Sequence, residues 1–136
     1  AVLEPVLNGE EILSLQSIVR KVPIADHVIR YATSLARATR LNQPETADFV
    51  KEWLAWGAGP RASQYMILGG KARAILNGRY FVSTDDIRSV AHPVLRHRII
   101  TNFNAEAEGI KSDNIVDRLL EHVPAKTAEG ADDRSA

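Results

Sequence analysis

Apolar residues recur every three or four positions along much of this chain, and that spacing restricts the possible folds more than any other feature. A stripe of this kind predicts a helix with one buried face and one solvated face. The stripes cover residues 12–22, 24–38, 65–76 and 115–120. We therefore predict an all-α fold, a bundle of four main helices with short extra helical segments and little or no sheet.

The first half of the chain contains two of these helices. Asn8 is a good N-cap, and the two glutamates after it fall in the first turn, where the helix dipole favours acidic side chains. The first helix is predicted over residues 9–21, before Pro23. The second carries the clearest stripe, which consists of Ile24, Val28, Tyr31, Leu35 and Ala38.

Residues 45–56 fit either a short helix or an extended segment that leads into Gly57. We expect Trp53 and Trp56 to lie in the core. A base-stacking surface would need basic residues between such aromatic rings, and only Lys51 is near them.

The longest helix of the second half is predicted to start at about Pro60 and to end at a C-cap formed by Asn77 and Gly78. Its expected buried stripe is Tyr65, Leu68, Ala72, Ile75 and Leu76. Ser83 and Asp86 approximate a capping box for a helix over residues 84–92, which Pro93 should interrupt. A last helix, capped by Ser112, should reach about residue 122.

Length and composition indicate one soluble domain. Residues 1–123 form the predicted helical domain, and residues 124–136 are small and polar enough to be disordered. The 17 basic and 17 acidic side chains balance, so the net charge does not favour nucleic acid. No cysteine is present for disulfides or thiolate metal sites, and no apolar run has the length of a membrane span. We expect a cytoplasmic protein.

Arg61 occupies an unusual position, in the first turn of a predicted helix. A cation there faces the positive end of the helix dipole, whereas the free amides of the same turn favour an anion. The segment Gly57-Ala58-Gly59-Pro60-Arg61 is therefore a candidate phosphate-binding site. The competing interpretation is an ordinary solvated arginine.

Several motifs together resemble one known family. Gly57-Ala58-Gly59-Pro60-Arg61-Ala62 is similar to the second-sensor motif of the MoxR family of AAA+ ATPases, which often has serine at the position of Gly59. Residues 80–87, 93–99, 105–109 and 115–120 resemble the C-terminal lid of that family, and Thr39-Arg40 fits its beginning. The resemblance covers roughly residues 3–123.

The resemblance implies a lid that closes over ATP bound to a P-loop core, which would precede Ala1 and hold the magnesium ion. Arg61 would act as the second sensor on the γ-phosphate, and Gly57, Ala58, Gly59 and Pro60 would complete the nucleotide-contacting loop. The family also implies a homo-oligomer, a hexameric ring, and chaperone-like work in complex assembly or cofactor insertion, with von Willebrand A domain proteins as partners. This chain alone should not hydrolyse ATP, because it has no Walker A loop.

Two other functions fit parts of the sequence. A helical protein-interaction module would leave Arg61 merely exposed. A helical nucleic-acid binder would use Arg73, Arg79, Arg96 and Arg98, although the neutral net charge weakens that interpretation. The four histidines share no metal-ligand spacing, and the sequence places no serine or carboxylate partner beside them.

Overall fold

The computed structural model describes residues 2–125, which contain seven helices and one two-stranded antiparallel sheet. The elements are α1 (Gly9–Lys21), α2 (Asp26–Ala38), α3 (Asp48–Trp53), β1 (Leu54–Trp56), α4 (Arg61–Leu76), α5 (Thr84–Leu95), β2 (Ile100–Thr101), α6 (Phe103–Ala107) and α7 (Ser112–His122). The predicted all-α fold is confirmed. The prediction of disorder for the tail falls, over residues 126–136, outside the described residues.

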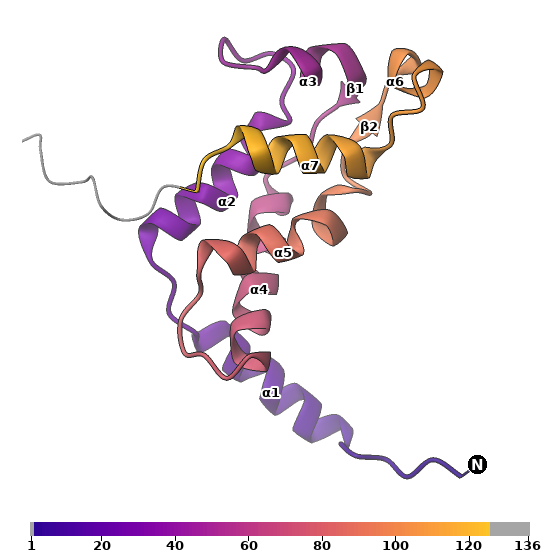
Figure 1. Ribbon diagram of the computed structural model, residues 1–136. Helices are drawn as coiled ribbons and strands as arrows, with labels where there is room; N and C mark the ends of the chain where they lie inside the picture. Colours follow the sequence, from indigo (N-terminus) through magenta and orange to yellow (C-terminus); the bar gives the residue numbers. More distant parts are fainter. Residues whose placement is uncertain (1, 126–136) are drawn as a thin grey trace, which may run out of the picture.

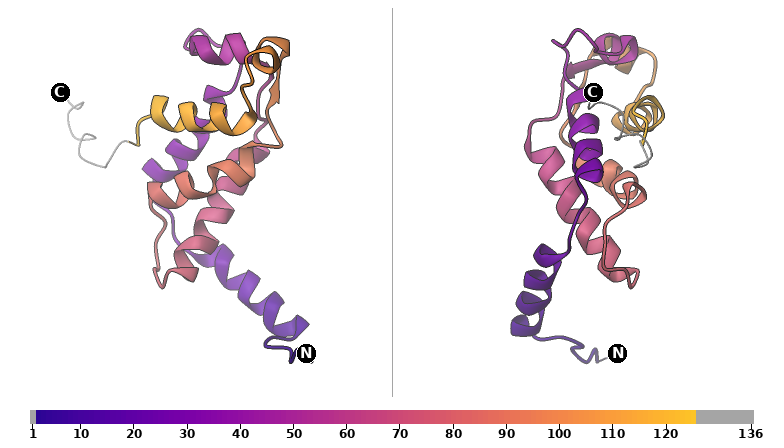
Figure 2. Two further views of the ribbon diagram at one scale, coloured as in Figure 1. Left: turned by 45° about the vertical axis from the view of Figure 1, so that its right-hand side comes forward. Right: turned by 90° about the vertical axis from the view of Figure 1, so that its left-hand side faces the viewer.

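Helices α2, α4, α5 and α7 form the body of the domain (Figure 1). Helix α3, the small sheet and α6 gather at one end of this body, and α1 projects from the other (Figures 1 and 2). The core lies where the four body helices meet, and its largest fully buried apolar side chains include Val28, Leu35, Met66, Ile87, Leu95, Ile115 and Leu119.

Helix α1 has the predicted bounds and the predicted cap. The Asn8 side chain accepts from the Glu11 amide at 2.9 Å, and the Glu11 carboxylate accepts from the Asn8 amide at 2.8 Å. The predicted burial of its stripe is wrong: because α1 projects from the body (Figure 1), no residue of the helix is buried, although Val22 immediately after it is. The C-terminal end of α1 is held to α4, because the Lys71 ammonium donates to the Arg20 carbonyl at 3.1 Å.

The packing of α4 on α5 corrects one prediction. The buried face of α4 is not the stripe that begins at Tyr65, which is 48% exposed; it is formed instead by Ala62, Met66, Gly70 and Ala74. These residues are mostly small, and a Cβ on Gly70 would lie 2.9 Å from Cδ1 of Ile87. The two helices therefore approach closely, and the larger side chains of α4 are left at the edge of the contact.

Three local predictions also differ from the structure. Trp53 is buried, but Trp56 is 69% exposed, because β1 turns its last residues towards solvent after Leu54. Helix α5 continues through Pro93 to Leu95, since the packing of Ala91 and Leu95 outweighs the loss of one helical hydrogen bond. The last helix is capped by residue 111, one position before the predicted cap.

A buried carboxylate joins the end of α4 to the start of α5. Asp86 accepts a bidentate pair of hydrogen bonds from the Arg79 guanidinium, one of them at 2.7 Å, and also accepts from the amide and hydroxyl of Ser83 at 2.9 Å. The predicted capping box of α5 is thereby confirmed. Before it, the chain leaves α4 through Gly78, whose φ of +68° is the left-handed conformation that favours glycine.

Asp86→Asn should lower the free energy of unfolding near neutral pH by about 2 kcal/mol. The hydrogen bonds from Arg79 lower the pKa of Asp86 from 3.8 to about 2, and a shift of this size corresponds to that free energy. Because the folded-state pKa is depressed, the stabilisation is complete above pH 4 and is lost as the pH falls towards 2. Urea unfolding between pH 2 and 7 should show this slope in the wild type and a flatter profile in the variant.

The matched control is Asp85→Asn, which removes the neighbouring exposed carboxylate. It should change stability by less than about 1 kcal/mol through the helix dipole alone. Equal effects of the two substitutions would show that the buried network contributes nothing specific.

Candidate functional site

The loop between β1 and α4 is fixed against the C-terminal end of α2. The Ala58 amide donates to Oγ1 of Thr39 at 2.8 Å, and the same hydroxyl donates to the Ala36 carbonyl at 2.7 Å. Gly57 lies so close to this turn that a Cβ on it would overlap the Thr39 carbonyl oxygen. The glycine is therefore required by close approach of two backbones.

Arg61 is the first residue of α4, one position after the predicted helix start, and it is exposed. Within residues 2–125 its side chain forms no hydrogen bond or ion pair, and the first turn of α4 contains no acidic residue. The helix also begins without a side-chain cap, since Pro60 occupies the N-cap. An uncompensated cation therefore stands beside a helix N-terminus, an arrangement that suits an anionic group.

The face of α4 that carries Arg61 lines an open apolar groove. One wall consists of Tyr65, Leu68, Gly69 and Ala72, and the other of Pro93, Val94, His97 and Arg98. The Arg98 guanidinium lies 4.8 Å from the centre of the Tyr65 ring. Arg61 is one helical turn before Tyr65 on this face. The stripe predicted to be buried thus forms the wall of a groove, with Arg61 beyond one end.

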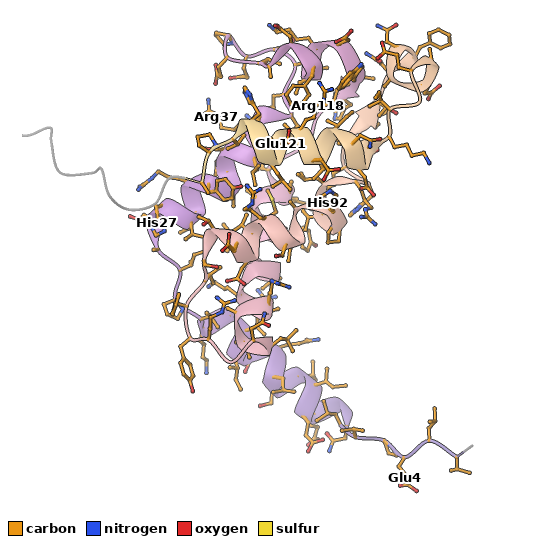
Figure 3. The ribbon with its side chains drawn as sticks, viewed as in Figure 1. Glu4, His27, Arg37, His92, Arg118 and Glu121 are labelled. Carbon is orange, nitrogen blue, oxygen red and sulfur yellow. The ribbon has the colours of Figure 1, made fainter. Side chains whose placement is uncertain are left out.

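The four arginines considered for nucleic acid already have partners inside the domain. Arg73 and Arg79 contact Asp86, Arg96 contacts Asp113 at 3.1 Å, and Arg98 stacks on Tyr65. Another arginine, Arg118 (labelled in Figure 3), lies 4.5 Å from the centre of the Trp53 ring. These contacts give the guanidinium groups structural roles.

His92 has a carboxylate partner that the sequence did not reveal. Its Nε2 lies 2.9 Å from Oδ1 of Asp117, and this contact joins α5 to α7. His92 is labelled in Figure 3. In the described part of the chain, histidine, aspartate and glutamate side chains form no group of three or more that could hold a metal ion. None of the helices described is both long and apolar enough to cross a membrane.

Thr39 is the residue at this site to which sequence reasoning gave no role. It is fully buried and continues the buried stripe of α2, formed by Val28, Ala32 and Leu35. A polar residue in such a stripe needs a hydrogen-bond partner, because an unpaired buried hydroxyl is costly. The spacing in the sequence therefore predicts a buried Thr39 with a hydrogen-bond partner. It does not identify that partner, the Ala58 amide, because the two residues are 19 positions apart.

Comparison with known proteins identifies the family. A family model described as the AAA lid domain matches residues 46–119. The chain belongs to this family, and its predicted resemblance to the lid of a MoxR-family AAA+ ATPase is confirmed.

Individual relatives agree with this assignment. The chain is 31% identical to the chaperone MoxR1 of Mycobacterium tuberculosis over 87% of its own length and 31% of the relative. It is 29% identical to the uncharacterised protein YeaC of Bacillus subtilis, over 95% of this chain and 38% of the other. A crystal structure of a candidate ATPase from Cytophaga hutchinsonii matches with a TM-score of 0.81 and 32% identity, over 87% of this chain and 36% of that one. The chain therefore spans about a third of each relative.

Gly57→Ala should destabilise the domain by about 2–3 kcal/mol, because the added methyl group meets a backbone carbonyl that cannot turn away. Gly59→Ala is the matched control, since a Cβ there has open space around it. Thermal unfolding should separate the two variants by several degrees. Similar melting temperatures would contradict the close approach of Gly57 to Thr39.

Proposed function

We propose that this domain is the lid of a longer AAA+ ATPase, that it closes over ATP bound to a P-loop core, and that Arg61 is its second-sensor residue. The observation that carries the proposal is the exposed guanidinium of Arg61, which has no hydrogen-bond or ion-pair partner among residues 2–125 and lies at the uncapped N-terminus of α4. The assignment to the AAA lid domain family and the similarity to MoxR1 support the choice of a nucleotide as the anionic ligand.

Arg61 would contact the γ-phosphate only when lid and core are closed. A charge-assisted hydrogen bond of this kind stabilises the closed state with ATP more than with ADP, and such a difference is what allows a nucleotide to shift a conformational equilibrium. Gly57, Gly59 and Pro60 would present their backbone to the nucleotide. Ala58 is buried and its amide already donates to Thr39, so it would hold the loop in place instead of contacting the ligand.

The rest of the nucleotide site would come from the core. No acidic cluster in residues 2–125 could hold magnesium, so the ion would be bound by the core and by the phosphates. The full-length protein would form a ring, a hexamer by family resemblance, in the cytoplasm. Its work would be chaperone-like complex assembly or cofactor insertion, with von Willebrand A domain proteins as candidate partners.

A second candidate, a helical interaction module without a nucleotide role, is favoured by the exposed apolar side chains of the N-terminal region. These are Val2, Leu3, Val6, Leu7, Ile12, Leu13, Leu15 and Ile18. The two candidates differ in whether the domain responds to nucleotide.

Arg61→Ala in the full-length ATPase should reduce steady-state ATP hydrolysis tenfold to a hundredfold. Loss of one charge-assisted contact of about 1.5–3 kcal/mol in the closed state has this effect on rate. The melting temperature of the isolated 136-residue chain should not change, because the side chain is solvated. A colorimetric phosphate assay and circular dichroism melting measure the two quantities.

Arg30→Ala is the matched control, since Arg30 is an exposed arginine on α2. It should leave both hydrolysis and melting unchanged. Normal hydrolysis by a folded Arg61→Ala enzyme would refute the second-sensor role and favour the interaction module, and an unfolded variant would make Arg61 a structural residue.

A further inference from the structure

We propose that Thr39 is a positioning residue for Arg61: its buried hydroxyl and carbonyl fix the loop from which Arg61 reaches the nucleotide. This inference rests on the proposed second-sensor role of Arg61. The connection runs from the C-terminal end of α2, through the backbone of Gly57 and Ala58, to the first residue of α4.

The Thr39 hydroxyl has a fixed orientation. It uses its proton to donate to the Ala36 carbonyl at 2.7 Å and its lone pairs to accept from the Ala58 amide at 2.8 Å. The side chain is fully buried, so no solvent competes for either bond. A buried hydroxyl bonded on both sides can hold a backbone amide in one place.

The carbonyl of Thr39 provides a second point of contact. It lies against Gly57, where even one added carbon would overlap it. The turn that carries this carbonyl is itself braced, because the Thr46 hydroxyl donates to the Arg40 carbonyl at 2.7 Å and accepts from the Gln43 amide at 3.2 Å. Gly57 and Ala58 therefore both have positions fixed by the C-terminal end of α2.

The path from this anchor to Arg61 is short and stiff. Only Gly59 and Pro60 separate Ala58 from Arg61, and the proline ring fixes φ, here −58°. The Gly59 carbonyl already accepts from the Ala62 amide at 3.0 Å, in the first turn of α4. A shift at Ala58 is therefore transmitted to the start of the helix, and with it to the guanidinium of Arg61.

The test compares Thr39→Val, which keeps the shape and removes the hydroxyl, with Thr39→Ser, which keeps the hydroxyl. In the full-length ATPase, Thr39→Val should reduce turnover about tenfold and weaken the preference for ATP over ADP, while Thr39→Ser should stay within about twofold of the wild type. Thr33→Val makes the same change on the exposed face of α2 and should have no effect. Amide exchange at Ala58, measured in the 136-residue chain, should accelerate at least tenfold in Thr39→Val only.

A double-mutant cycle separates positioning from stability. In the Arg61→Ala background, Thr39→Val should cause no further loss of turnover, because the group that it positions is gone. An equal loss in both backgrounds, or normal turnover despite faster Ala58 exchange, would overturn the inference and leave the second-sensor role intact. No effect of Arg61→Ala itself would refute the proposed function. Should Thr39→Val not fold, Thr39→Ala replaces it in the same cycle.

Discussion

The buried carboxylate of Asp86 is the interaction on which the geometry of the body depends. It connects the far end of α4, through Arg79, to the first turn of α5. Apart from Asp86, which also contacts Arg73, the two helices are held by apolar contacts such as those of Gly70 with Ile87 and of Gly69 with Val90. A charge-assisted, bidentate hydrogen bond fixes register, because it tolerates little displacement.

The other end of α4 begins at Arg61, three residues after Ala58, whose amide donates to the buried Thr39 hydroxyl. Buried polar contacts therefore hold the chain just before and just after this helix. The 16 residues of α4 span about 24 Å, and Asp86 and Thr39 act at opposite ends of that length. Between them, Ala62, Met66, Gly70 and Ala74 press α4 against the rest of the core. The candidate site thus lies at the N-terminal end of α4, a helix whose position relative to the core is fixed along its length.

Much of this architecture could be predicted from residue patterns, because helix ends depend on neighbours in the sequence. The caps at Asn8 and Ser83 and the turn at Gly78 were found in that way. The prediction of the buried face of α4 was wrong. It chose Tyr65 and Leu68 because they are large and apolar, whereas the close packing of this helix on α5 favours small residues. The position of Arg61 at a helix start could be read from Pro60. Its anchor, Thr39, could not, since that contact joins residues brought together only by the fold.

Helix α1 and the body of the domain are expected to unfold separately. Because it buries no residue, breaking its hydrogen bonds exposes little apolar surface that was not already in water. A 13-residue helix with this little support is marginal on its own, so we expect α1 to open and close as a local unit while the body stays folded. Its amides should exchange with solvent through that local opening, whereas those of α4 and α5 wait for global unfolding. The described part of the chain therefore combines a body that shares one core with a helix that is tied to this body at its C-terminal end, through Lys71.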